Sequence, residues 1–200
     1  GETQSIDADT DFSRELLRAC RNCNNVKIMD DGKLLGDATE QGIIRLLQKV
    51  GHLEKVGEER LFEIPFSSAS KWHLVVAAVD DSFPYIFVKG APEKVFSMCE
   101  YYLSDEDDSQ IRINESFREK FYSVYEELGS NGLRVIACAG RRMNHHESYA
   151  DRKHFKFDNL VFYGLLGLQD PPKPGIKETV SRIKGAGISM SMITGDHPIT

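Results

Sequence analysis

Apolar positions along the chain alternate between helical and strand spacing, and polar turn residues separate the segments. Helices are predicted where apolar residues recur every three or four positions, at residues 12–23, 38–50 and 114–128. Pro92 suits a first helical turn and predicts a short helix at 92–99. Runs of apolar and β-branched residues bounded by turn signals predict strands, at 61–65, 72–79, 85–88 and 133–140. A hairpin is predicted around Asp30-Asp31-Gly32, between residues 26–29 and 33–35.

The pattern changes near residue 158. A strongly apolar strand at 160–168, a helix at 177–186 and a buried strand at 188–193 predict a βαβ unit, which belongs in a parallel sheet. The preceding part, with hairpins and segregated helices, predicts a mainly antiparallel α+β domain. We therefore expect two domains, residues 1–158 and 159–200. The second is incomplete, because one crossover unit cannot close a sheet.

Composition and charge narrow the classes of function. The 200 residues carry a formal net charge of −6, and an acidic surface repels a phosphate backbone, so nucleic-acid binding is not expected. The longest apolar runs, at 74–79 and 160–168, are shorter than the roughly 20 residues that a membrane helix needs. The first five residues have neither a basic start nor an apolar stretch, so we do not expect a signal peptide.

Cysteine and histidine spacings do not predict a metal site. Cys20-Arg21-Asn22-Cys23 has the spacing of half a zinc site, but the chain has no second pair of that kind. The pair lies in a helical pattern, so we expect at least one thiol to be buried as a small apolar group. His145-His146-Glu147 lies in a polar loop and is expected to be solvated.

The usual phosphate-binding loops, G-x-x-x-x-G-K-[ST] and G-x-G-x-x-G after a strand, are missing. Four short stretches suit a different way of holding a nucleotide. They are Gly36-Asp37-Ala38-Thr39-Glu40, residues 64–71 (IPFSSASK), residues 89–93 (KGAPE), and residues 170–173 (DPPK) followed by TGDHPIT at 194–200. In this order and spacing they resemble the nucleotide-binding domain, with part of the phosphorylation domain, of type II P-type ATPases.

Three residues support nucleotide binding by their own chemistry. Phe66 lies in a loop at a strand end among serines, where an exposed ring can stack on adenine. Lys71 follows in the same loop as a flexible cation for the phosphates. Gly90 is expected to let a ligand approach the backbone closely.

The resemblance implies roles for further residues. Lys89 corresponds to the lysine at the base of the ATP pocket, and Glu40 to an acidic pocket residue that contacts adenine or holds a neighbouring cation. Arg134 corresponds to an arginine that reaches the phosphates or ribose. His73 occupies a position where some relatives have an amide near the base, although a histidine on a strand face explains it equally well.

The C-terminal stretches have implied roles in the phosphorylation domain, which is of the haloacid-dehalogenase (HAD-like) type. Asp170, Pro171 and Pro172 form a stiff corner that resembles the hinge across which the nucleotide domain swings. Thr194, Gly195 and Asp196 follow a buried strand, where a hydroxyl and backbone N–H groups can hold a transferred phosphoryl group. The phosphorylated aspartate of the family, in an Asp-Lys-Thr-Gly-Thr motif, is not in this chain.

The resemblance therefore implies the cytoplasmic domain of an integral membrane protein that hydrolyses ATP, with Mg²⁺, to transport cations. The isolated chain is expected to be a monomer that binds ATP without turnover, and its partners are the phosphorylation, actuator and membrane domains of the parent. Residues 64–66, the stretch at 89–93 that begins with Lys89, and residues 194–200 favour a Na⁺, K⁺ or H⁺ pump, whereas residues 170–174 favour a calcium pump. A soluble phosphohydrolase would need its own nucleophilic aspartate, and a non-catalytic nucleotide-binding or interaction module is the remaining alternative.

Overall fold

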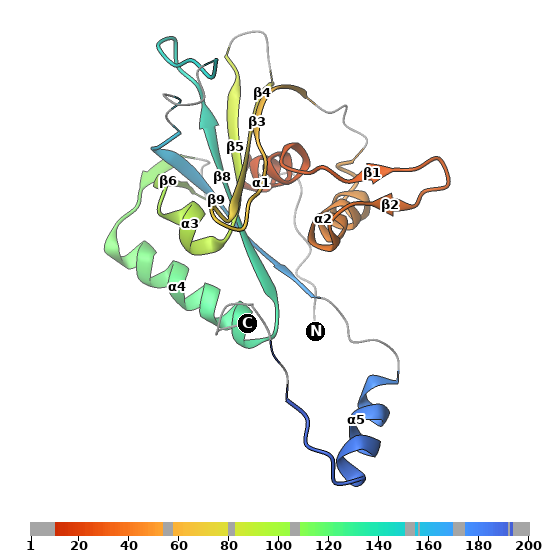
Figure 1. Cartoon of the computed structure of the whole chain (residues 1–200). Coiled ribbons are helices and arrows are strands. Elements are labelled where there is room, and N and C mark those ends of the chain that lie inside the picture. The colour runs from red at the N-terminus through yellow and green to blue at the C-terminus, as the bar shows by residue number, and fades with distance from the viewer. Residues whose placement is uncertain are drawn as a thin grey trace.

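The computed structural model describes residues 11–53, 58–79, 83–104, 109–150, 155, 157–169, 175–191 and 193. Its centre is a seven-stranded sheet with the order β3-β4-β5-β8-β9-β6-β7 (Figure 1). Neighbouring strands pair antiparallel except β6 and β9, which are parallel. The strands are β3 (Glu59–Ile64), β4 (Trp72–Ala78), β5 (Tyr85–Gly90), β6 (Cys99–Leu103), β7 (Gln110–Arg112), β8 (Arg134–Arg142) and β9 (Leu160–Leu168).

Helices cover both faces of this sheet. On one face, α1 (Asp11–Asn22) and α2 (Ala38–Lys49) pack Leu17, Cys20 and Leu47 against strand residues such as Val75 and Phe87. The opposite face is covered by α3 (Pro92–Phe96) and α4 (Glu115–Ser130), whose buried side chains form a second apolar cluster with alternate strand residues. Successive side chains of the central strands therefore point into two different cores, rather than alternating between one core and solvent.

The structure confirms the first two predicted helices and the small hairpin, which were predicted from capping, turn and periodicity patterns. The hairpin strands β1 (Lys27–Ile28) and β2 (Leu34–Leu35) pair antiparallel, and Gly32 takes the positive φ of 79° that the turn requires. Helix α2 begins after Asp37, whose side chain accepts hydrogen bonds from the N–H groups of Thr39 and Glu40. It ends before Gly51, which has a φ of 69°.

Two strands in the middle of the chain were missed. The predicted helix at 92–99 ends at Phe96, and Cys99 already begins β6. Aromatic residues favour strands, and Tyr102 of β6 stacks on Phe117 of α4 with ring centroids 3.7 Å apart. The short edge strand β7 has no apolar alternation to reveal it, since all three of its residues are exposed.

The strand at 160–168 was assigned to the wrong sheet partner. We expected it to open a second, parallel domain after residue 158, but β9 lies between β8 and β6 in the seven-stranded sheet. Its apolar run reflects burial on both faces: Val161 and Tyr163 enter one core, and Leu160 and Phe162 enter the other. A central strand of this mixed sheet, antiparallel to β8, parallel to β6 and covered by two helical layers, has the same apolar pattern as a strand of an all-parallel sheet.

The predicted βαβ unit is not completed in the described residues. Helix α5 (Ile176–Gly185) forms as expected, but it has no buried residue and lies away from the sheet (Figure 1). Residues 188–191 and 193 form neither helix nor strand, so the predicted strand at 188–193 is wrong for those residues. In the part of the chain that the structure describes, no helix is both long and apolar enough to cross a membrane.

Candidate functional site

Three of the four sequence stretches, at residues 36–40, 64–71 and 89–93, meet at one end of the sheet. Phe66 and Lys71 lie in the loop between β3 and β4, and the register pairs Trp72 with Gly90, the last residue of β5. Gly90 in turn pairs with Ala137, near the start of β8 where Arg134 lies. Antiparallel pairing thus brings together residues that lie far apart in the sequence.

Phe66 is available to a ligand. Its side chain is 60% exposed, although a free aromatic ring would normally seek burial. The loop around it is held by its own hydrogen bonds: the Ser67 and Ser70 hydroxyls are 2.7 Å apart, and the Lys71 N–H donates to the Ser67 carbonyl over 2.8 Å. An ordered loop that presents an exposed ring is suited to stacking on a flat, apolar ligand face.

Gly90 packs closely against the backbone of a neighbouring segment. The Lys71 carbonyl accepts a hydrogen bond of 2.9 Å from the Ala91 N–H, which draws the two backbones together. A Cβ at Gly90 would lie 2.4 Å from that carbonyl oxygen and 2.6 Å from the Trp72 Cα. The space beside Gly90 is therefore filled by the backbone of the chain itself, and Lys71 has an unusual positive φ of 62° beside it.

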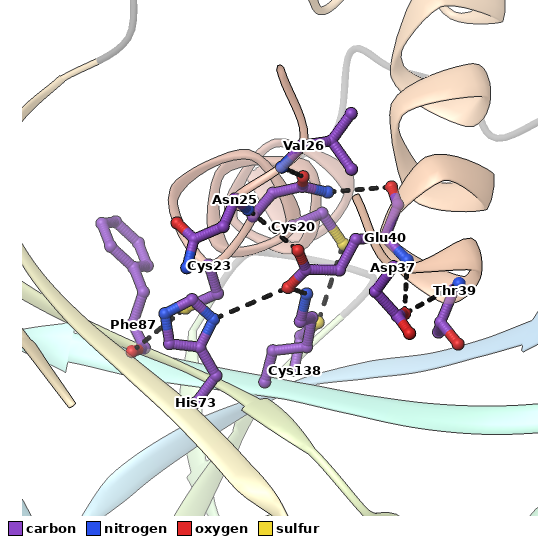
Figure 2. Close-up of polar contacts among 12 residues, drawn as sticks. Cys20, Cys23, Asn25, Val26, Asp37, Thr39, Glu40, His73, Phe87 and Cys138 are labelled. Atoms are coloured by element: carbon purple, nitrogen blue, oxygen red, sulfur yellow. Dashed lines mark hydrogen bonds and ion pairs between the residues drawn. The ribbon is translucent and has the colours of Figure 1, made fainter. Parts of the chain in front are cut away.

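Glu40 and Lys89 form an ion pair beneath this end of the sheet. The Lys89 ammonium, in a side chain only 7% exposed, lies 2.9 Å from Glu40 Oε1. Glu40 Oε2 accepts the backbone N–H of Asn25 over 2.9 Å (Figure 2). Burial alone would raise the pKa of Glu40, but the contacts from His73, Lys89 and the Asn25 N–H outweigh it and lower the pKa to about 2.

His73 joins the same cluster and is almost fully buried, at 1% exposure. It lies directly opposite Lys89 in the β4–β5 register. His73 Nε2 is 2.9 Å from Glu63 Oε1, and Nδ1 is 3.8 Å from Glu40 Oε1. Sequence reasoning missed Glu63 and Asn25, and the one available signal was a carboxylate in the otherwise apolar strand predicted at 61–65.

Arg134 connects the start of β8 to the start of α2. Its Nη1 donates to the Thr39 hydroxyl over 3.1 Å, and Thr39 is adjacent to Glu40 in the first turn of the helix. The guanidinium stays exposed at the edge of the cluster. Lys89 thus contacts Glu40, and Arg134 contacts Thr39, the residue before Glu40.

Other predicted residues lie elsewhere or outside the description. Asp170, Pro171, Pro172, Thr194, Gly195 and Asp196 are outside the described residues. Cys20 and Cys23 are both fully buried, which confirms the prediction that at least one of these thiols is an apolar core group. Within the described ranges no group of three or more His, Cys, Asp or Glu side chains could hold a metal ion.

A separate cavity of about 490 Å³ lies between α4 and strands β6 and β9. Its lining is mainly apolar and aromatic, with Phe117, Phe121 and Phe162 among its residues. These side chains belong to the core beneath α3 and α4, whereas Glu40, His73 and Lys89 lie on the α1–α2 face. The cavity is therefore separate from the site formed by the three described stretches.

Comparison with known proteins decides the family. The sequence model for the P-type ATPase cytoplasmic domain N matches residues 12–175, which is most of the chain. The chain belongs to the P-type ATPase N-domain family. The matched range includes β9, which follows the domain boundary that we expected near residue 158.

Relatives of this N domain include pumps for different cations. Calcium-transporting ATPase 1 of Yarrowia lipolytica is 36% identical over 92% of the chain, and the sodium/potassium-transporting ATPase subunit alpha-4 of Homo sapiens is 30% identical over 100%. The potassium-transporting ATPase alpha chain 1 of Xenopus laevis is 30% identical over 98%. The chain spans about a fifth of the length of these relatives, with 20%, 21% and 21% covered, respectively.

Proposed function

We propose that this N domain binds ATP and presents its γ-phosphate to an aspartate that lies outside the chain. The observation that carries the proposal is the meeting, at one end of the sheet, of an exposed aromatic ring with two exposed cations and a paired acid and lysine. Each of these groups has a matching part of ATP. The alternative of a purely structural cluster does not explain why Phe66 is held exposed in an ordered loop.

Phe66 stacks on the adenine ring in this proposal, with a contribution of about 1–3 kcal/mol. The Glu40–Lys89 pair lies below, where a carboxylate acceptor and an ammonium donor can bind the polar edge of the base. Because Glu40 compensates its charge, Lys89 attracts phosphates less than an isolated lysine would.

Lys71 and Arg134 bind the phosphates or ribose. Both side chains are exposed at this end of the sheet, so each contributes a solvent-screened attraction. One stacking contact and a few screened cations predict weak binding, with a dissociation constant of roughly 0.1 mM to a few mM. The isolated domain binds without turnover, because the nucleophilic aspartate is elsewhere.

The parent protein is, in this proposal, an ATP-hydrolysing cation pump in a membrane that uses Mg²⁺. Its other domains are the partners of this domain, which by itself is a monomer. We favour a monovalent-cation pump from the resemblance of residues 64–66, 89–93 and 194–200. A calcium-type pump is the second candidate, supported by the 36% identity to the Yarrowia calcium-transporting ATPase.

The C-terminal residues have proposed roles in the HAD-like phosphorylation domain. Asp170, Pro171 and Pro172 form the hinge, and Thr194, Gly195 and Asp196 bind the phosphoryl group beside the absent aspartate. Because β9 belongs to the N-domain sheet, we place the start of the phosphorylation segment after Leu168 rather than at residue 159.

Amide chemical shifts during an ATP titration test the proposal on the wild-type chain. We expect saturable shifts at Phe66, Lys71, Gly90 and Arg134, with little change in α4. Saturable shifts confined to the cavity beneath α4 would place the nucleotide in a different site. No shifts at 10 mM ATP, well above the expected dissociation constant, would refute nucleotide binding by this domain.

A further inference from the structure

His73 is held between two carboxylates from different elements. Glu63 of β3 lies on one side of the imidazole ring and Glu40 of α2 lies on the other (Figure 2 shows the Glu40 side). The ring is 1% exposed, so it cannot exchange these neighbours for water without local opening. Its two nitrogens therefore have fixed surroundings.

The chemistry of the two contacts differs. A carboxylate only accepts hydrogen bonds, so the 2.9 Å contact to Glu63 requires a proton on Nε2. In the neutral ring that leaves a lone pair on Nδ1, directed toward a carboxylate oxygen of Glu40 at 3.8 Å. A second proton turns Nδ1 into a donor and makes that contact attractive.

The charges of the ionised residues around His73 sum to zero while the imidazole is neutral. Glu40 and Glu63 carry two negative charges, while Lys89 and Arg60 carry two positive charges. Lys89 pairs with Glu40 at 2.9 Å, and Arg60 Nη1 lies 3.6 Å from Glu63 Oε2. A proton on Nδ1 of His73 therefore gives the cluster a net positive charge.

The thiols near the cluster do not alter this balance. Burial raises the pKa of Cys23, at the end of α1, to about 12. Cys138 of β8 is opposite Lys89 in the sheet, and its contact with Cys20, together with burial, raises its pKa well above the usual value. Both thiols are thus neutral at physiological pH.

The same oxygen of Glu40 lies near Lys89 and near His73. Its Oε1 accepts from Lys89 and is also the atom nearest to His73 Nδ1. When His73 is protonated, it competes with Lys89 for this oxygen, and the positive charge of Lys89 is less completely compensated. The base of the site then becomes more attractive to an anion.

We propose that His73 is a positioning residue that acts through the Glu40–Lys89 pair and makes nucleotide affinity depend on its own protonation. This inference rests on the proposed ATP site and adds a means of regulation to it. ATP, an anion, binds more tightly when His73 carries its second proton. Adenosine, which has no charge, does not.

The test compares the wild-type chain with His73→Gln by titrating ATP and adenosine at pH 7.5 and pH 5.5. The glutamine amide donates to Glu63 but does not titrate. The ionisation of ATP itself is common to both proteins, so it cancels in the comparison. We expect the wild type to gain about two- to fivefold in ATP affinity at pH 5.5 relative to the variant, a modest factor because solvent and salt screen the charges.

A direct measurement keeps the inference testable even if His73→Gln does not fold. The imidazole resonances of His73 in the wild type are followed by NMR from pH 5 to pH 8, with and without saturating ATP. We expect the titration to move to higher pH when ATP is bound, because binding and protonation favour one another. His73→Asn provides a second variant for assigning these resonances.

Each outcome separates this inference from the proposed function. ATP binding whose pH dependence is the same in wild type and variant, or an ATP-independent His73 titration, would overturn the role of His73 and leave the ATP site intact. An equal gain for adenosine would also overturn it, because charge would not be the cause. Absence of ATP binding at both pH values would remove the proposed function as well.

Discussion

Replacing Glu40 of the Glu40–Lys89 pair should destabilise the domain more than replacing Lys89. In Glu40→Gln the Lys89 ammonium remains in a side chain only 7% exposed, without the carboxylate that lies 2.9 Å from it. In Lys89→Met a flexible apolar chain fills the same space, while Glu40 keeps the N–H of Asn25. An uncompensated buried charge is the costlier result.

The structure sets the size of this difference. Removing one partner of a fully buried pair costs about 3–5 kcal/mol, and Glu40 is only partly buried. We therefore expect Glu40→Gln to lose about 2–4 kcal/mol of unfolding free energy at pH 7. Lys89→Met should lose about 1–2 kcal/mol, because its cost is limited to the lost contacts.

Urea unfolding followed by tryptophan fluorescence measures both values. Trp72, the one tryptophan in the chain, packs on Phe157 with ring centroids 5.1 Å apart and reports on this end of the sheet. The double variant completes a cycle that isolates the coupling between the two side chains. Equal losses in the two single variants, or a larger loss in Lys89→Met, would refute the reasoning.

Three further predictions concern stability. Gly90→Ala should lower the free energy of unfolding by about 1–3 kcal/mol, the typical cost of overpacking. The cause is that a Cβ would lie 2.4 Å from the Lys71 carbonyl oxygen. A thermal midpoint equal to that of the wild type would contradict this prediction. Asp37→Ala should cost about 0.5–2 kcal/mol through loss of the α2 cap, with Asp37→Asn much closer to wild type; the two variants should therefore differ in urea midpoint. The folded-state pKa of Glu40 is lowered to about 2 from an unfolded value of about 4.5. The stability that ionised Glu40 contributes is therefore complete above about pH 4.5 and is lost as the pH falls toward 2. Unfolding free energies measured from pH 6 to pH 2.5 should decline less in Glu40→Gln than in the wild type.

Much of the N domain was predictable because its signals are local. The cap at Asp37, the glycine turn at Gly32 and the periodic apolar residues of α1, α2 and α4 all act within a few residues of one another. The direction of strand pairing is not local. The apolar run of β9 satisfies both a parallel strand and a buried antiparallel one, so its true neighbours, β8 and β6, could not be read from it.

The same distinction applies to the candidate site. Short motifs identified Phe66, Lys71, Lys89 and Arg134, and the structure brings them to one end of the sheet. The contacts that tune the site were not predictable, because Glu63 and Asn25 reach His73 and Glu40 only through the packing of β3 against β4 and the loop after α1. The close packing of Gly90 against the backbone of Lys71 and Trp72 was likewise not predictable from the motif.

Calorimetric titration of ATP into the wild type, Phe66→Ala and Tyr122→Ala tests the central claim most directly. Tyr122 is a matched control, since it is an aromatic residue 48% exposed on α4, on the opposite helical layer. We predict that Phe66→Ala weakens ATP binding by about 1–3 kcal/mol, with unchanged stability, and that Tyr122→Ala binds like the wild type. Equal ATP affinity in all three proteins would contradict the claim that the exposed ring at this end of the sheet holds the nucleotide.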